Sequence, residues 1–265
     1  MSKLNNLTDF VTSLANAFRS KLGTTAKINP QDFDSKVTEV YSKGVHDGST
    51  AGADALHKAF CDIFQNYGNR TDYSRAFCGE GWTRDTFKPI YDIQPTNAYY
   101  MFAYSRIYEN FAKLLRDLGV TLDLSKATNI EECFAASAFK RLGIIDTTSA
   151  DVLSKLFLYA TSLIEINKLI LRDDGSQSFH RAFGGCKKLI TLNVKGVIGG
   201  TTFNVSASPL LSKASIVSIV NAVSETQATT ITLSRTAVKT AFGSSTSTEW
   251  LNLRNTRPKC TVVLA

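Results

Sequence analysis

The chain has 265 residues, of which 43% are hydrophobic, and its formal net charge is +7. This composition predicts a soluble globular protein with a sizeable core, built as one elongated domain or two compact ones. No segment approaches the roughly 18 consecutive apolar residues of a membrane span, so we expect no membrane insertion. The 5 cysteines are odd in number and form no CxxC pair, which excludes a secreted disulfide framework.

The basic residues are scattered rather than clustered. They never run longer than a pair, and acids are interspersed, so we expect no nucleic-acid partner. From Lys195 onward, however, 7 basic residues stand against only Glu225 and Glu249. Two interpretations of this tail stay open: a solvated surface that keeps the protein soluble, or contact with an anionic partner such as a cell-wall glycan.

The first segment has the apolar pattern of an amphipathic helix. Apolar residues recur at steps of three and four positions, and Gly23 follows the last of them. A second helix begins at Asn29, with Pro30 in its first helical position. Both apolar stripes need a partner, so we expect residues 1–57 to serve attachment and oligomerisation. The residues expected at the oligomer contact are Leu7, Phe10, Val11, Leu14 and Phe18.

Three glycines mark the end of this segment. Gly44, Gly48 and Gly52 stand four positions apart. If the second helix continues through them, they form one stripe that lets another backbone come close; otherwise they form a flexible linker. In either case we place the boundary of the N-terminal segment after residue 57.

A repeat occupies residues 58–205. Its anchor is a phenylalanine in a short apolar motif such as "AFGGCKKL", and successive anchors are 25, 32, 23 and 26 residues apart. Leucine-rich repeats have about 20 to 29 residues per unit, which fits this series with one lengthened unit. That unit carries the helical-looking insertion "YENFAKLLRDLGV". The anchors are Phe77, Phe102, Phe134, Phe157 and Phe183.

A small residue stands three positions after each of the last four anchors, and an apolar ladder follows it. We expect the anchor and the ladder to point inward and the small residue to permit the tight turn between them. One such unit cannot bury its apolar side alone, but four or five stacked units form a continuous core. The small residues are Ser105, Ser137, Ala160 and Cys186.

Residues 206–265 have the pattern of a capping unit. Ser212 is the expected cap of a helix with a broad apolar face. A strand in "TTITLS", a short helix in "RTAVKTAF" and a strand in "CTVVLA" follow it. A stack of repeats needs a terminal unit over its last turn, and this segment fits that role.

Three motifs resemble reactive or binding sites but are better explained as architecture. His180 and Cys186 have no second pair of ligands nearby in sequence for zinc, and Cys186 takes the small position of the repeat. "RDDGSQ" lacks the alternating acids and closing glutamate of a calcium loop and predicts a polar turn. "GVIGGTTFN" lacks a phosphate-binding pattern and also predicts a turn. We therefore expect no metal, cofactor or catalytic residue.

The aromatic-rich stretch around residues 81–104 is the candidate ligand-binding region. Its rings are of the types enriched in binding surfaces and in carbohydrate stacking. The alternative interpretation is that they close the N-terminal end of the repeat stack. The candidate ligand-binding residues are Trp82, Tyr91, Tyr99 and Tyr100.

The recurring AF-x-x-C-x-x-L pattern, with its following ladder, resembles the BspA-type leucine-rich repeats of surface and phage-encoded proteins of gut and oral bacteria. The stretch "LTDFVTSLANAFRSKLGTTAKINPQDFDSKVTEVY" is similar to a short module on tail-associated proteins of phages and prophages of Gram-positive hosts. The end of the chain, from "LLSKASIVSIVNAVSE" to "TVVLA", is similar to the end unit of those proteins.

The resemblance implies an α/β fold: a leucine-rich-repeat solenoid of about four to five irregular units, with an N-terminal helical segment and a C-terminal helix and strand cap. It implies a non-enzymatic virion protein of a tail tip, baseplate or fibre that displays a surface for host-cell recognition or structural attachment. Its partners would be other tail proteins and a host receptor, either glycan or protein. Fibres of this class are commonly trimeric homo-oligomers.

Two other classes of protein are compatible with parts of the pattern. A bacterial cell-surface leucine-rich-repeat adhesin would need export, and the start of the chain lacks the uninterrupted apolar run of a secretory signal, which favours the virion. An enzyme such as a wall hydrolase would need a convergent acid and base or an activated nucleophile, and the sequence shows no such set.

Overall fold

The computed structural model describes residues Thr12, Ala15, Asn16, Arg19, Ser20, Gly23, Thr25, 71–84, Phe87 and 92–265. The chain divides into two compact units, 1–70 and 71–265, so this division falls later than the boundary expected after residue 57. Repeats and cap belong to one unit. The five residues expected at the oligomer contact, Leu7, Phe10, Val11, Leu14 and Phe18, lie outside the described residues.

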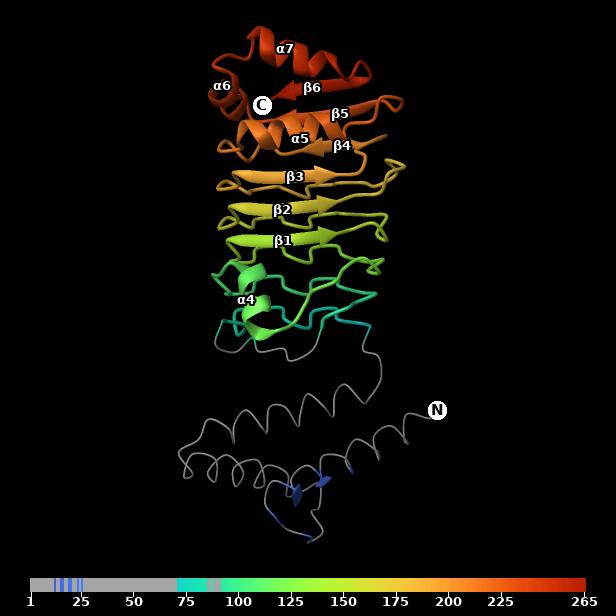
Figure 1. Ribbon diagram of the computed structural model, residues 1–265, viewed down its shortest axis with the longest axis vertical. Helices are drawn as coiled ribbons and strands as arrows, with labels where there is room; N and C mark the ends of the chain where they lie inside the picture. Colours follow the sequence, from blue (N-terminus) through green and yellow to red (C-terminus); the bar gives the residue numbers. More distant parts are fainter. Residues whose placement is uncertain are drawn as a thin grey trace. The chain divides into compact units, whose positions relative to one another are not determined.

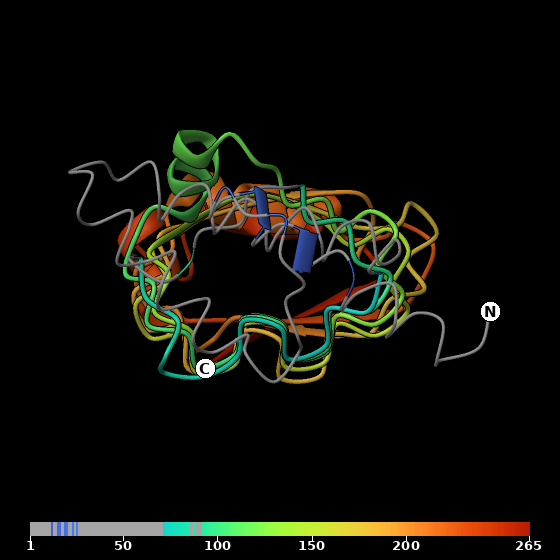
Figure 2. The ribbon, with the colours of Figure 1, turned by 90° about the horizontal axis from the view of Figure 1, so that it is seen from below.

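Unit 71–265 is a stack of parallel coils, each joined to the next by backbone hydrogen bonds (Figure 1). The anchor phenylalanines occupy equivalent places in this ladder. The amide of Phe102 donates to Cys133 O, that of Phe134 donates to Leu156 O, and that of Phe157 donates to Ala182 O. Viewed along the stack, the coils superimpose around a common outline (Figure 2).

The anchors form a column of stacked rings inside the coils. Phe102 and Phe134 have centroids 5.6 Å apart with planes 7° from parallel, and Phe134 and Phe157 are 5.6 Å apart at 14°. Both ends of the column continue this contact, from Phe77 at 5.1 Å to Phe183 at 5.4 Å. The small residues three positions after the anchors are buried, as the spacing predicts.

One face of the stack is a parallel sheet of three strands, β1 (Arg141–Asp146), β2 (Glu165–Ile170) and β3 (Thr191–Lys195). Its register pairs Leu142 with Ile166 and Ile166 with Leu192, so the buried ladder residues of successive coils lie side by side. The ladder residues that follow Phe157 and Phe183 thus occupy equivalent places in neighbouring coils.

Helices cover the two edges of this sheet. Helix α4 (Phe111–Leu118) is the insertion of the lengthened unit; it is capped by Asn110, whose backbone forms a bridge with Arg141 of β1. Figure 2 shows α4 outside the common outline of the coils. Helix α5 (Lys213–Ala222) follows β3 in the stack and is capped by Ser212, as predicted.

Helix α5 closes the β3 edge with side-chain hydroxyls rather than with a strand. The amide of Leu192 donates to Ser215 Oγ at 2.9 Å, and the amide of Val194 donates to Ser218 Oγ at 2.8 Å. Each serine hydroxyl in turn donates to a carbonyl of the same chain segment, Ser215 to Ile190 O and Ser218 to Val194 O. The two β3 amides that have no partner strand at this edge are thereby satisfied.

The C-terminal part contains a second parallel sheet of β4 (Thr202–Asn204), β5 (Thr229–Leu233) and β6 (Cys260–Leu264). β5, helix α6 (Arg235–Phe242) and β6 match the predicted order of elements. Two features differ from the prediction. "GVIGGTTFN" is not a turn throughout, because its last residues pair with β5. Helix α7 (Thr248–Asn255) was not predicted, since Trp250 is its only buried residue.

Gly196, at the end of β3, is required by its conformation and by its neighbours. Its φ is +96°, and a Cβ there would lie 2.3 Å from Leu171 O. We expect Gly196→Ala to lower the free energy of unfolding by about 1–3 kcal/mol, measured by urea denaturation. Gly243→Ala is the control. Gly243 has φ +76°, and no atom lies within 4 Å of an added Cβ, so this variant measures the cost of the backbone conformation alone. An equal loss in Gly243→Ala would show that the Leu171 clash contributes nothing.

Candidate functional site

The face of the stack opposite the β1–β3 sheet repeats one backbone conformation from coil to coil. The residues two positions before and two positions after each anchor have positive φ, which non-glycine residues rarely adopt. Because the coils are in register, these positions form two columns. The leading column is Arg75, Tyr100, Glu132, Lys155 and Arg181. The trailing column is Gly79, Tyr104, Ala136, Tyr159 and Gly185.

The leading column is a chain of polar contacts between successive coils. The Arg75 guanidinium lies 5.4 Å from the centre of the Tyr100 ring, in a cation–π contact. The Tyr100 hydroxyl donates to the Glu132 carboxylate, and Lys155 Nζ lies 2.7 Å from Glu132 Oε1. The three steps are therefore a charge on a ring, a hydroxyl hydrogen bond to a carboxylate, and a pair of unlike charges.

Glu132 is the buried centre of this column. Burial raises its pKa, but hydrogen bonds from Lys155 and Tyr100 outweigh burial and hold the net pKa below its ordinary value of 4.5. A depressed folded-state pKa contributes stability that is present above the unfolded pKa and is lost as pH falls through the folded pKa. The carboxylate therefore stabilises the stack at neutral pH.

We expect Glu132→Gln to flatten the loss of stability below about pH 4.5, measured as the free energy of unfolding across a pH series. Asp123 and Asp174 also have lowered pKa values, each through hydrogen bonds from a serine two positions later. Part of the loss of stability at low pH should therefore remain in this variant. A pH profile parallel to that of the unchanged chain would contradict the role given to Glu132.

Arg181 ends the leading column without a counter-charge. It is exposed and makes no ion pair within the described part of the chain. The next coil places Phe203 of β4 after it, and that ring is fully buried. The column of alternating contacts thus stops at a guanidinium that faces solvent.

The trailing column presents two open tyrosine rings. Tyr104 is 51% exposed and Tyr159 is 56% exposed, although both lie beside buried anchors. Ala136 separates them in the column, so they lie two coils apart, at about 10 Å by the usual spacing of neighbouring strands. Each ring is followed by a small residue in the next coil, which leaves room for the ring on the surface.

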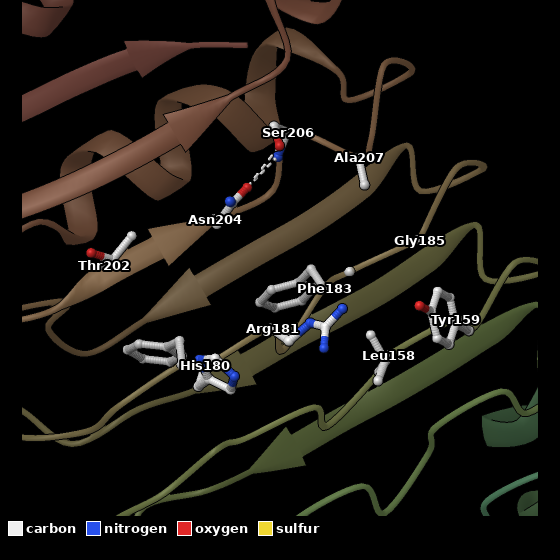
Figure 3. A pocket seen from close by; sticks show the side chains of 12 residues that line it. Leu158, Tyr159, His180, Arg181, Phe183, Gly185, Thr202, Asn204, Ser206 and Ala207 are labelled. Atoms are coloured by element: carbon white, nitrogen blue, oxygen red, sulfur yellow. Dashed lines mark hydrogen bonds between the residues drawn. The ribbon is translucent and has the colours of Figure 1, made fainter.

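Tyr159 and Arg181 border a depression of about 390 Å³, which we call the Tyr159 depression (Figure 3). Its lining comes from three successive coils and includes no carboxylate and no thiol. In the last of these coils Asn204 Oδ1 accepts hydrogen bonds from the amide and hydroxyl of Ser206. The side chains around it that carry polar atoms are Tyr159, His180, Arg181, Thr202, Asn204 and Ser206.

The four residues predicted to bind a ligand are placed differently from one another. Trp82 is half-buried and packs edge-on against Phe77 at 5.1 Å, in the aromatic cluster of the first described coil. Tyr99 and Tyr100 are half-buried neighbours 4.7 Å apart, beside Arg75. Tyr91 lies outside the described residues. Packing thus accounts for the three that are described.

The sequence interpretation missed Tyr159 and Arg181. Both lie in motifs that were used to define the repeat, "LFLYATSL" and "HRAFGGC". The signal is positional: a tyrosine two places after an anchor, or an arginine two places before one, is on the surface.

Cys186 is buried, and "RDDGSQ" is tied into a turn. Cys186 is fully buried, and burial raises its pKa to about 12, so its thiol stays protonated at neutral pH. His180, six positions earlier, is exposed. In "RDDGSQ", Asp174 Oδ1 accepts from the amide and hydroxyl of Ser176, as expected of a polar turn.

No family model, curated protein or solved structure matches the chain. Within the described residues, no helix has the length and apolar character needed to cross a membrane. The same part of the chain contains no group of three or more His, Cys, Asp or Glu side chains placed to hold a metal ion.

Proposed function

We propose that the chain is a non-enzymatic virion protein of a phage or prophage tail. In this proposal, unit 71–265 is a leucine-rich-repeat solenoid that displays a surface for recognition of the host cell. The unit 1–70 attaches the protein to other tail proteins and joins copies of the chain into a homo-oligomer. The observation that supports it best is the separation of a constant core from a variable surface.

The anchor position and its neighbours show this separation. Every coil from Phe77 to Phe183 keeps the same ring in the core, whereas the leading column two positions away carries arginine, tyrosine, glutamate, lysine and arginine in turn. The stacking of the coils therefore accommodates different residue types at these positions. Recognition surfaces of repeat proteins are built in this way, because each coil contacts only its neighbours.

The chemistry of the Tyr159 depression supports binding rather than turnover. Hydrolysis of a glycan needs a pair of carboxyl groups about 5–10 Å apart, and the lining of this depression contains none. An activated thiol is also missing from the lining, and the two buried thiols of the described residues, Cys133 and Cys186, have pKa values raised by burial. The groups present are suited to hold a ligand in place.

Immunogold electron microscopy tests the proposal. An antibody against the full chain would be applied to phage particles released from the strain that carries the gene, and to intact cells of the same strain. We expect gold at one end of the tail and none on the cells. Label on the cell surface, with unlabelled particles, would support the adhesin instead and overturn the proposal.

A further inference from the structure

The Tyr159 depression combines three kinds of group that the packing of the coils does not use: an open aromatic face, a guanidinium with no ion pair among the described residues, and amide and hydroxyl donors. We propose that it binds a sugar that carries a carboxylate, with the sugar ring on Tyr159 and the carboxylate on Arg181. This inference rests on the proposed function, because it names the class of host glycan that the displayed surface would recognise.

The Tyr159 ring is held in place by the coil that follows it. A Cβ on Gly185 would lie 2.8 Å from Tyr159 Cδ1, and a Cβ on Gly184 would lie 2.8 Å from Leu158 Cδ1. The two glycines therefore let the side chains of the preceding coil lie close against the backbone. The ring remains 56% exposed, so one face stays open to a ligand. A fixed aromatic face loses little entropy when a sugar stacks on it.

Arg181 supplies the charge for the carboxylate. A planar guanidinium matches a carboxylate with two parallel hydrogen bonds, and such charge-assisted pairs are the strongest of the ordinary polar contacts. Arg181 makes no such pair within the described residues, and no acid lines the depression to compete with a ligand. The chain's net charge of +7 adds a general attraction for anions.

Asn204 and Thr202 supply directional contacts for sugar hydroxyls. The two hydrogen bonds from Ser206 occupy Asn204 Oδ1 at 3.0 and 2.8 Å and fix the amide plane. The Asn204 Nδ2 donors and the Thr202 hydroxyl have no partner among the described residues, and both side chains line the depression. Figure 3 shows them in the coil beyond Arg181. A neutral peptide would leave the guanidinium unused, whereas an acidic sugar engages all three kinds of group.

To test the inference, the full chain is titrated with each ligand, and isothermal calorimetry measures the binding. The probe is trigalacturonate, and the matched ligand is its methyl ester, which keeps the rings and removes the charge. We expect the ester to bind at least about tenfold more weakly, since a charge-assisted hydrogen bond is lost. A phosphorylated trisaccharide forms the third arm and should also bind more weakly than trigalacturonate.

The repeat provides matched control variants for both key residues. Arg181→Gln should weaken trigalacturonate binding at least about tenfold, whereas Arg75→Gln, at the equivalent position of another coil, should leave it unchanged. Tyr159→Ala should weaken binding, Tyr159→Phe should preserve it, and Tyr104→Ala should have no effect. Tyr104 shares the column, the exposure and the backbone conformation of Tyr159.

Three results would overturn the inference: no binding of trigalacturonate, equal binding of its methyl ester, or the same loss in Arg75→Gln as in Arg181→Gln. Tighter binding of the phosphorylated trisaccharide would show that the depression prefers a phosphate group, and it would overturn the proposal that the ligand carries a carboxylate. These results are distinct from those of the immunogold experiment, because the label locates the protein whether or not it binds this saccharide.

Discussion

Replacing Phe134 by alanine should lower the free energy of unfolding by about 3–5 kcal/mol, the range for a fully buried phenylalanine. Phe134 lies in the middle of the ring column, between Phe102 and Phe157, and also contacts Phe139 edge-on at 5.9 Å. The cavity would open at the junction of two coils, where neighbouring backbones are tied by hydrogen bonds and collapse only in part. The cost should therefore fall in the upper half of the range.

Equilibrium urea unfolding, followed by far-ultraviolet circular dichroism, measures this loss. Tyr104→Ala is the control, because it removes an aromatic ring that is 51% exposed from the neighbouring coil and should cost far less. The two tryptophans can report on unfolding at separate places, because Trp82 lies in the first described coil and Trp250 lies in α7. A loss below about 1 kcal/mol would show that the ring column is not the main source of stability.

The parts of the fold that the sequence predicted are those with a local signal. The anchor spacing located every ring of the column, and Ser212 and the apolar face that follows it located the start of α5. The strands β5 and β6 are short runs of β-branched residues, which is a strong local preference. In each case the residues that determine the element lie within it.

The parts that were missed depend on contacts between coils. β4 is a strand because β5, more than twenty residues later, pairs with it, and α7 is a polar helix held mainly by Trp250 against Phe242. Exposure at a surface position depends on the same kind of contact. Aromatic composition drew attention to Trp82, which packs against Phe77. The open rings of the trailing column are Tyr104 and Tyr159, and Gly185 in the next coil leaves room for the Tyr159 ring.

The other large effect is expected at the β3 edge. Ser215→Ala and Ser218→Ala each remove the acceptor of a strand amide, from Leu192 at 2.9 Å and from Val194 at 2.8 Å. A buried donor left without a partner costs about 1–3 kcal/mol, and the contact of Leu192 is buried while that of Val194 is partly buried. We therefore expect the larger loss from Ser215→Ala, and about 2–5 kcal/mol from the double variant.

Urea unfolding of both single variants and the double variant measures this effect. Ser218→Thr keeps the hydroxyl and should recover most of the stability lost in Ser218→Ala, which separates the hydrogen bond from a general effect on α5. Ser176→Ala removes an exposed hydroxyl that donates to Asp174 and accepts a long contact of 3.5 Å from Arg172, and it should change stability by less than about 0.5 kcal/mol. If the double variant proved as stable as the unchanged chain, the β3 amides would have to be satisfied by water, and α5 would cover the sheet through its apolar face alone.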